Sequence, residues 1–207
     1  MFPFIETVRL VDGIPQNRAG HETRVRRTCR AMGWQEKTVP WEALIAQTDI
    51  PEGIAKLHFE YGEQGFGKAD CRPYVARNIR SLRVVVDNDI EYSLKRTDRT
   101  SLNRLAEQRG DGDEVLIVKN GCVTDTSYTN VAFFDGSDWI TPDTPLLPGT
   151  MRERLLQQRR IVERRIRLED IHSFRSVSLF NAMMDLGQLM VPADKIVLPY
   201  GQESCLP

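Results

Sequence analysis

The strongest constraint on the fold is the dipeptide Asn120-Gly121, which separates two apolar stretches. Residues 114–118 (EVLIV) have the length and composition of a buried strand, and residues 128–134 (YTNVAFF) follow as a second strand. Asn-Gly readily takes the positive φ values that a two-residue hairpin turn requires. The sequence therefore predicts a β-hairpin whose strands need packing partners elsewhere in the chain.

The returning arm of this hairpin is unusually polar for a packed strand. It contains Asp125, Thr126, Ser127, Thr129 and Asn130. A hydroxyl-rich strand can simply be a solvated sheet edge, and taken alone this is the simpler interpretation. Asp125, however, follows the turn beside residues suited to lining a polar cavity. A carboxylate buried there would need a cationic partner or would be protonated.

The rest of the chain alternates strands with helices. Strands are expected at 2–10, 54–61, 78–86, 139–141, 159–165, 176–180 and 195–198, and helices at 17–33, after Pro40, at 98–109 and after Gly149. The Gly-rich stretch 62–68 (GEQGFGK) is expected to be a flexible loop. This mixture predicts an α+β (mixed α/β) fold with two layers in each domain.

A polar, turn-rich segment at 87–94 indicates the domain boundary. It divides the chain into a small N-terminal α/β domain at 1–88 and a larger C-terminal domain at 89–207. Both segments contain enough apolar residues to bury a core, since hydrophobic residues make up 41% of the chain.

Composition argues against several classes of protein. The net charge of −1 gives no electrostatic basis for binding nucleic acid or an anionic membrane surface. We expect no membrane span and no signal peptide, because no apolar run approaches the roughly 20 residues that a span needs. The four cysteines lie far apart without the spacing of a zinc site, so no metal is expected. We therefore expect a soluble cytoplasmic protein with free thiols.

Two turns have the composition of anion-binding sites. Gly149 permits close backbone approach, and the first N–H groups of the helix after it have no internal acceptors. Asn181-Ala182 are expected to start a second short helix at the end of a strand, with the same potential. A helix that starts after Pro-Gly is common, so neither turn alone establishes a phosphate site.

Two further features bear on chemistry. Arg24 and Thr28 are four residues apart and share a helix face, with His21 one turn from Arg24. His21 alone is more often structural than catalytic. Lys95 lies at the expected domain junction, where a cleft would lower its pKa and suit it to imine chemistry. An exposed linker lysine is the alternative.

The order and spacing of these features resemble the fold-type IV pyridoxal-phosphate enzymes, which include class IV aminotransferases and 4-amino-4-deoxychorismate lyase. The matching stretches are, in order, FIETVRL, HETRV, KRTDR, DEVLIVKNGCVTDTSYTN, LLPGTMR and FNAM. They extend over most of the chain. The resemblance implies the two-domain fold of that family, although this chain is shorter than typical members.

The resemblance also implies a role for each matching residue. Lys95 would carry pyridoxal 5'-phosphate (PLP) as an imine, and Asp125, where the family usually has Glu, would face the ring nitrogen. The phosphate would be held by Arg24, the backbone amides of Thr150 and Met151, and Asn181 with Ala182, while Ser127 and Thr129 would line the cavity. Because Lys95 must be neutral for part of the cycle, its pKa should fall well below ~10.4.

The implied function is a PLP-dependent enzyme that acts on an amino acid or amino-substituted acid as an aminotransferase or as an aminodeoxychorismate-type lyase. The motifs do not separate these two reactions. The alternative is a non-catalytic relative that keeps the fold as a binding or scaffold protein. The family also implies a homodimer. The group that grips the substrate carboxylate is left open among Arg72, Tyr74, Tyr92 and Arg96.

Overall fold

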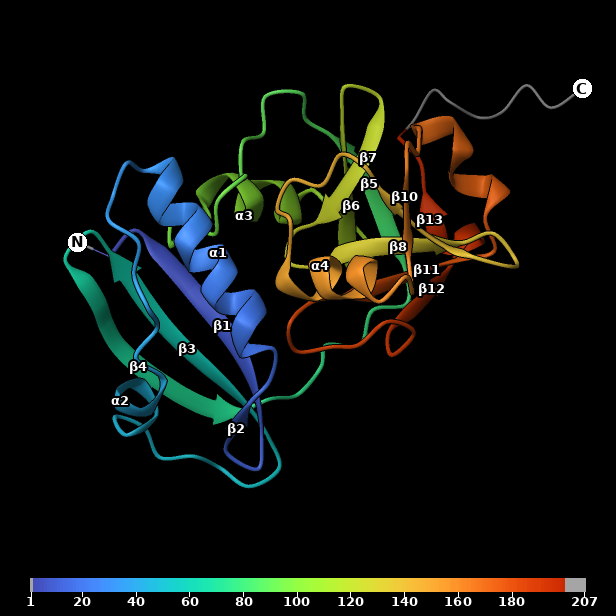
Figure 1. Cartoon of the computed structure of the whole chain (residues 1–207). Coiled ribbons are helices and arrows are strands. Elements are labelled where there is room, and N and C mark those ends of the chain that lie inside the picture. The colour runs from blue at the N-terminus through green and yellow to red at the C-terminus, as the bar shows by residue number, and fades with distance from the viewer. Residues whose placement is uncertain (1, 200–207) are drawn as a thin grey trace, which may run out of the picture.

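A computed structural model describes residues 2–199, and its strands form three sheets. Figure 1 shows the first sheet with helices α1 and α2 on one side of the molecule and the other two sheets beside it. The mixed α+β fold predicted from the sequence is confirmed. Within residues 2–199, every helix is too short or too polar to cross a membrane.

The N-terminal sheet has the strand order β2-β1-β3-β4. Its elements are β1 (Phe4–Val11), β2 (Ile14–Pro15), α1 (Arg18–Ala31), α2 (Trp41–Ile45), β3 (Ile54–Gly62) and β4 (Gly65–Pro73). Alternation along β1 divides its side chains between two faces. Phe4 and Val8 pack in one apolar cluster with Val25 of α1. Ile5 and Thr7 point to the opposite face, which is the wall of a cavity.

The rest of the chain forms two sheets, with the orders β13-β5-β6-β7 and β10-β9-β8-β11-β12. The strands are β5 (Leu82–Val86), β6 (Glu114–Lys119), β7 (Cys122–Thr126), β8 (Asn130–Phe134), β9 (Trp139–Pro142), β10 (Val162–Arg164), β11 (Ser176–Phe180), β12 (Met190–Pro192) and β13 (Ile196–Val197). The helices are α3 (Thr100–Glu107), α4 (Thr150–Gln157) and the 3-10 helices η1 (Leu168–Ser173) and η2 (Ala193–Lys195).

These two sheets pack face to face, and the alternation of β6 explains why its run is apolar throughout. Leu116 and Val118 point into the core shared with the second sheet. Val115 and Ile117 point the other way and contact a cluster that contains Leu102 of α3. Helix α4 covers the outer face of the other sheet. A strand buried on both faces needs a continuous apolar sequence, which is what residues 114–118 supply.

The turn predicted at Asn120-Gly121 is confirmed, but the strand that returns from it is β7, whereas the predicted second strand at 128–134 is β8 of the other sheet. Strands β6 and β7 pair antiparallel on either side of it. The two turn residues have φ values of 51° and 74°. Positive φ at both positions is the requirement of the tight hairpin turn, and Asn and Gly meet it at little cost.

Two local expectations are wrong. Residues 65–68 are the start of β4 rather than part of a flexible loop, because β4 pairs with β3 through backbone hydrogen bonds that need no particular side chain. Asn181-Ala182 do not start a helix. The N–H of Asn181 donates to the carbonyl of Met184 and the reverse, both at 3.2 Å, which closes a turn instead.

Strand β5 bears on where the domains divide. It lies within the segment 1–88 that the sequence assigned to the N-terminal domain, yet it pairs in parallel with β6 of the second sheet. We therefore propose that the junction lies in the link between β4 and β5, at 74–81, and that β5 belongs to the C-terminal domain.

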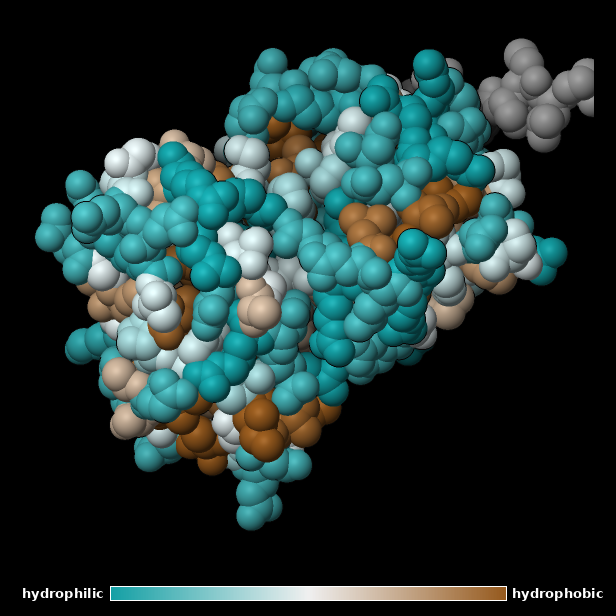
Figure 2. Space-filling view, viewed as in Figure 1, coloured by the Kyte–Doolittle hydropathy of each residue, from teal (hydrophilic) through white to brown (hydrophobic). Residues whose placement is uncertain are grey.

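The surface agrees with the charged composition of the chain. Most of the face in Figure 2 is hydrophilic, with hydrophobic residues in separate patches. Cys29, Cys71 and Cys122 are free thiols, and Cys205 lies outside the described residues. Among residues 2–199, no three His, Cys, Asp or Glu side chains are grouped so that they could hold a metal ion.

Candidate active site

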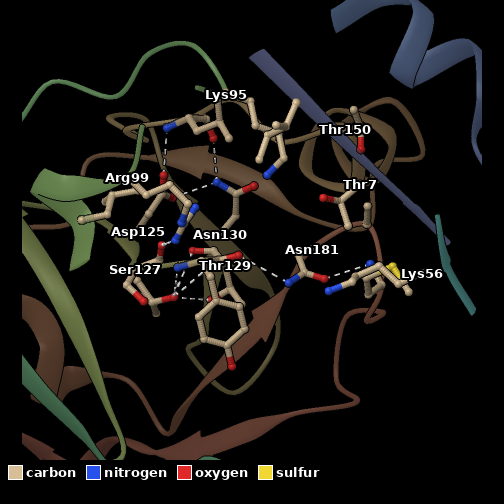
Figure 3. Close-up of a pocket in the computed structure, with 18 of the residues that line it drawn as sticks. Thr7, Lys56, Lys95, Arg99, Asp125, Ser127, Thr129, Asn130, Thr150 and Asn181 are labelled. Atoms are coloured by element: carbon tan, nitrogen blue, oxygen red, sulfur yellow. Dashed lines mark hydrogen bonds between the residues drawn. The ribbon is translucent and has the colours of Figure 1, made fainter. Parts of the chain in front are cut away.

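A cavity of about 670 Å³ lies between the N-terminal sheet and the two C-terminal sheets. Its walls come from β1, β3, the turn between β7 and β8, the start of α4 and residues 181–183. Figure 3 shows Thr7 and Lys56 of the N-terminal sheet at one side of the cavity and Asp125 and Ser127 at the other. Eight of the predicted site residues line it together: Arg24, Lys95, Asp125, Ser127, Thr129, Thr150, Asn181 and Ala182. Convergence of these distant residues on one cavity is typical of a ligand site.

Lys95 is held beside the N-terminal sheet by backbone hydrogen bonds to β1 and to the residue before it. The N–H of Ile5 donates to the carbonyl of Lys95 at 3.0 Å, and the N–H of Thr97 donates to the carbonyl of Pro3 at 2.9 Å. The segment thus extends the edge of the first sheet, with a bridge between Phe4 and Arg96. This anchoring fixes the backbone of Lys95 while its side chain lines the cavity.

The pKa of Lys95 is lowered to about 7. Burial is the largest cause because it disfavours the charged ammonium, and the nearby charge of Arg24 lowers it further. The carboxylate of Glu6 acts in the opposite direction. A substantial fraction of Lys95 is therefore the neutral amine near pH 7, the form that attacks a carbonyl carbon.

Asp125 owes its position to an irregularity in the hairpin. Leu116 pairs with Thr126, but Val118 pairs with Val123, so two residues of β7, Thr124 and Asp125, oppose one residue of β6. Such a β-bulge changes the direction of a side chain and is frequent beside active sites. The bulge is secured by the hydroxyl of Thr124, which donates to the carbonyl of Ile117 at 2.7 Å. It gives Asp125 its place in the cavity wall.

The carboxylate of Asp125 is held by two neutral donors. Asn130 Nδ2 donates to Oδ1 at 2.8 Å, and the N–H of Leu147 donates to Oδ2 at 2.9 Å. Burial raises the pKa of Asp125 to about 6, because these bonds and the more distant charge of Arg152 offset the loss of water only in part. Asp125 is thus ionised at neutral pH and retains lone pairs for another donor.

The hydroxyl groups that follow Asp125 form a compact turn rather than a solvated edge. Thr126 Oγ1 and Thr129 Oγ1 are 2.7 Å apart, and the N–H of Thr129 donates to Thr126 Oγ1 at 2.9 Å. The carbonyl of Ser127 accepts from Arg99 at 2.7 Å. Ser127 and Thr129 are buried and line the cavity, as expected.

The start of α4 has the features of an anion site. Thr150 is its first residue, and Thr150 Oγ1 is buried with no hydrogen-bond partner among residues 2–199. The first N–H groups of the helix have no acceptor within the helix. A Cβ on Gly149 would lie 2.1 Å from Asn130 Oδ1, so only glycine lets this turn approach the Asp125 network. The orphaned hydroxyl and the helix N-terminus fit a phosphate group.

The other predicted phosphate residues contribute unequally. Asn181 Oδ1 accepts from the N–H of Met183 at 2.8 Å, and its amide donates to the carbonyl of Tyr128 at 3.4 Å, so the side chain is oriented beside the cavity. Ala182 lines the cavity through a turn instead of the expected helix. Met151 is not among the lining residues, and its side chain packs in an apolar cluster, which leaves its backbone N–H for an anion.

Arg24 lines the cavity but is bound to a partner that the sequence did not suggest. Its Nε and Nη2 donate to the two oxygens of Glu6 at 2.8 and 2.6 Å, and His21 Nδ1 is 2.6 Å from Glu6 Oε2. Burial alone would raise the pKa of Glu6, but the charge and hydrogen bonds of Arg24, with His21, lower it to about 2. Glu6 therefore fixes the guanidinium of Arg24 and neutralises it.

Of the four candidates for the substrate carboxylate, only Tyr74 and Tyr92 line the cavity. Arg72 is paired with Asp70 at 2.6 Å, and the guanidinium of Arg96 lies over the ring of Phe4 at 5.3 Å. Sequence reasoning missed three lining cations, Lys56, Arg77 and Arg99, and one lining imidazole, His58. The alternation of β3, where buried Leu57 separates Lys56 from His58, is a signal that could have placed those two on one face.

Known proteins resemble the chain over nearly its whole length. The family model for amino-transferase class IV matches residues 92–190. An uncharacterized protein of Haemophilus influenzae is 38% identical over 190 residues, which cover 90% of this chain and 100% of that protein. A crystal structure of a proposed 4-amino-4-deoxychorismate lyase of Haemophilus somnus has 35% sequence identity and a TM-score of 0.81, and covers 90% of this chain and 98% of that one.

The chain belongs to the class IV aminotransferase family, the fold-type IV pyridoxal-phosphate enzymes. A hypothetical aminotransferase of Mycobacterium tuberculosis in its PLP-bound form has the same fold, with a TM-score of 0.76 at 18% identity over 94% of this chain and 81% of that one. The resemblance drawn from the motifs is therefore confirmed at the level of the family.

Proposed function

We propose that this class IV aminotransferase relative is a PLP-dependent enzyme in which Lys95 holds the cofactor covalently. The observation that carries the proposal is one cavity that contains three complementary groups: an amine with a pKa of about 7, a buried carboxylate, and an orphaned hydroxyl at a helix N-terminus. PLP has an aldehyde, a ring nitrogen and a phosphate to match them, and when bound it supplies an aldehyde for amines and a ring that accepts electrons from Cα.

We assign binding of the cofactor phosphate to the start of α4 and the residues around it. Thr150 Oγ1 and the backbone amides of Thr150 and Met151 would donate to the phosphate, with Asn181 beside them. Arg24 adds a guanidinium held in place by Glu6. Several donors that converge on one dianion bind it without any single strong site.

We assign binding of the cofactor ring to Asp125 and proton transfer to Lys95. Asp125 would hold a protonated ring nitrogen, and the hydrogen bonds from Asn130 and from the N–H of Leu147 fix the orientation of its carboxylate. Lys95 would be the group that moves the Cα proton of the substrate, because its lowered pKa leaves the amine neutral.

The first test is covalent attachment. The purified protein with PLP should absorb in the visible region, and borohydride reduction should leave the cofactor on the peptide that contains Lys95, as read by mass spectrometry. Lys95→Ala should lose both signals, while Lys68→Ala, at an exposed position, should keep them. A colourless protein that ignores PLP would favour the non-catalytic binding or scaffold protein.

The second test separates the two reactions. We propose that the substrate is an amino acid or amino-substituted acid, and 4-amino-4-deoxychorismate is the first compound to test because the Haemophilus somnus relative is a proposed lyase of it. Release of the aromatic amine product assigns a lyase. Transfer of an amino group to 2-oxoglutarate assigns an aminotransferase. We also propose a homodimer, which light scattering would measure directly.

A further inference from the structure

Helix α1 begins with a residue in an uncommon conformation. Its N-cap, Asn17, has a φ of 53°, in the left-handed region that is costly for most residues other than glycine. An N-cap asparagine ordinarily accepts a hydrogen bond from an N–H of its own helix, but the side chain of Asn17 makes no such bond. Backbone strain of this kind persists where the surrounding structure fixes it, and it is frequent at functional sites.

The side chain of Asn17 is instead bonded to the C-terminal part of the molecule. Its Nδ2 donates to the carbonyl of Thr150, the first residue of α4, at 3.1 Å. Gly20 leaves room for this side chain, since a Cβ there would lie 2.6 Å from Asn17 Nδ2. Glycine in a helix is otherwise destabilising relative to alanine. The left-handed N-cap and the helical glycine are therefore both explained by one contact, the hydrogen bond from Asn17 to Thr150.

A second side chain of α1 is bonded to the same turn. Arg27 Nη2 donates to the carbonyl of Pro148 at 3.0 Å, and its Nη1 forms an ion pair with Glu153 of α4. The carbonyls of Pro148 and Thr150 belong to the residues before and after Gly149. Helix α1 therefore holds this turn on both sides of the glycine.

The contact between the two parts of the molecule is concentrated at the proposed phosphate site. In the described part of the chain, every side-chain hydrogen bond between the elements up to β4 and those from β5 onward ends on residues 148–153 or on Asp185. Asp185 follows the turn at 181–184 and accepts from Arg9 Nη1 at 3.2 Å. The N-terminal part thus contacts both turns to which we assign phosphate binding.

We propose that Asn17 and Arg27 are positioning residues that fix the phosphate turn, defined as residues 148–151, so that its donors converge on the cofactor phosphate. The inference rests on the proposed function. Neither side chain lines the cavity, so both act through the carbonyls that they bind. Cofactor affinity then depends on the packing of α1 against α4, and by linkage a bound phosphate strengthens that packing.

The test compares PLP with pyridoxal, which has the same aldehyde and ring but no phosphate. Each compound is titrated into cofactor-free protein, and the visible absorption band gives an apparent Kd. Asn17→Gly permits the same left-handed backbone and removes the amide, so the loss of one hydrogen bond should weaken PLP binding roughly three- to tenfold. The affinity for pyridoxal should stay at the wild-type value, because pyridoxal makes no contact with the phosphate turn.

Two further variants and two controls sharpen the comparison. Gly20→Ala displaces the amide of Asn17 and should have the same selective effect, although alanine is the better helix former. Arg27→Met should also weaken PLP binding selectively. Asn120→Gly makes the same replacement at a hairpin residue with a φ of 51°, and Arg30→Met removes an exposed arginine of α1. Both controls should keep the ratio of the two affinities within about twofold of wild type.

Urea denaturation of the cofactor-free variants shows which of them are folded. If Arg27→Met does not fold, Asn17→Gly and Gly20→Ala decide the outcome. Equal weakening of PLP and pyridoxal binding in these variants, or unchanged affinity for both compounds, overturns the proposal. Failure of the proposed function is recognised separately, in wild-type protein that gives no visible absorption band with either compound and no reducible link at Lys95, and the inference then falls with it.

Discussion

Two buried carboxylates, Glu6 beneath α1 and Asp125 in the β7 bulge, have opposite surroundings. They are 0% and 5% exposed, so burial by itself acts to raise the pKa of both. Glu6 accepts two hydrogen bonds from Arg24 and contacts His21, and its pKa is lowered to about 2. Asp125 accepts from two neutral amides, and its pKa is raised to about 6.

The difference shows that Glu6 already has its counterion within the protein, whereas Asp125 can still accept a hydrogen bond from a cationic ligand. Glu6 forms its ion pair within the protein, and we infer that its role is to orient Arg24. Among residues 2–199, no cation contacts the oxygens of Asp125. A cationic ring N–H placed there would stabilise the carboxylate at a site already desolvated, where a charged hydrogen bond is strong. The comparison predicts that the two acids respond differently to removal of charge.

The largest effect on stability is expected for Glu6→Gln. This change leaves the charge of Arg24 buried without a counterion, which costs about 3–5 kcal/mol of unfolding free energy. Urea denaturation of the cofactor-free protein measures it. Glu36→Gln, in an exposed pair with Arg30, is the control and should change stability far less. Equal effects of the two substitutions would show that burial of the Glu6 pair does not matter.

Asp125→Asn should mainly affect turnover. The neutral amide cannot stabilise a protonated ring nitrogen, so kcat should fall roughly 10²–10³-fold. Unfolding free energy should change by only about 1 kcal/mol, because the neutral donors lose little. Assays of kcat and bound cofactor test this, with exposed Asp111→Asn as the control. Large destabilisation with normal kcat would assign Asp125 a structural role.

Gly149→Ala tests the close contact between Gly149 and Asn130, the residue that donates a hydrogen bond to Asp125. The added Cβ would lie 2.1 Å from Asn130 Oδ1, so Asn130 or the start of α4 must move. Overpacking of this kind costs about 1–3 kcal/mol. Loss of the Asn130 hydrogen bond should also raise the pKa of Asp125. Denaturation measures the unfolding free energy, and the pH dependence of cofactor absorption reports the pKa of Asp125. If both quantities stay at their wild-type values in Gly149→Ala, the close contact between Gly149 and Asn130 is wrong.

The smallest expected effect is a difference in pH dependence. The lowered pKa of Glu6 contributes stability that is present above pH 4.5 and is lost as pH falls through about 2. The raised pKa of Asp125 contributes stability that is present below pH 3.8 and is lost as pH rises through about 6. Cofactor-free protein should therefore lose stability at this site between pH 4 and 6.

Denaturation midpoints measured across that range separate the two acids. Asp125→Asn should remove the loss between pH 4 and 6, and Glu6→Gln should leave it in place. A loss that persists unchanged in Asp125→Asn would have to come from another group, and the contrast between the two carboxylates would then be wrong.

The sequence predicted those parts of the site whose chemistry is local. Lys95, Asp125 and Thr150 could be recognised because each belongs to a short motif and because the order of the motifs is itself informative. Glu6 could not be recognised, since its neighbour Arg24 is brought to it by the packing of α1 on β1. Lys56 was missed for a related reason, because only the packing of the N-terminal sheet against the rest of the chain makes it a lining residue of the cavity.

By itself, the sequence determined the hairpin at Asn120-Gly121, the mixture of strands and helices, and the residue types that can hold an aldehyde and a phosphate. These follow from backbone preferences and apolar periodicity, which act over a few residues. Tertiary structure alone decided the bulge that positions Asp125, the pairing of β5 with the second sheet, and the ion pair between Glu6 and Arg24. Burial and charge compensation depend on contacts between residues far apart in the chain, and only the folded protein brings those residues together.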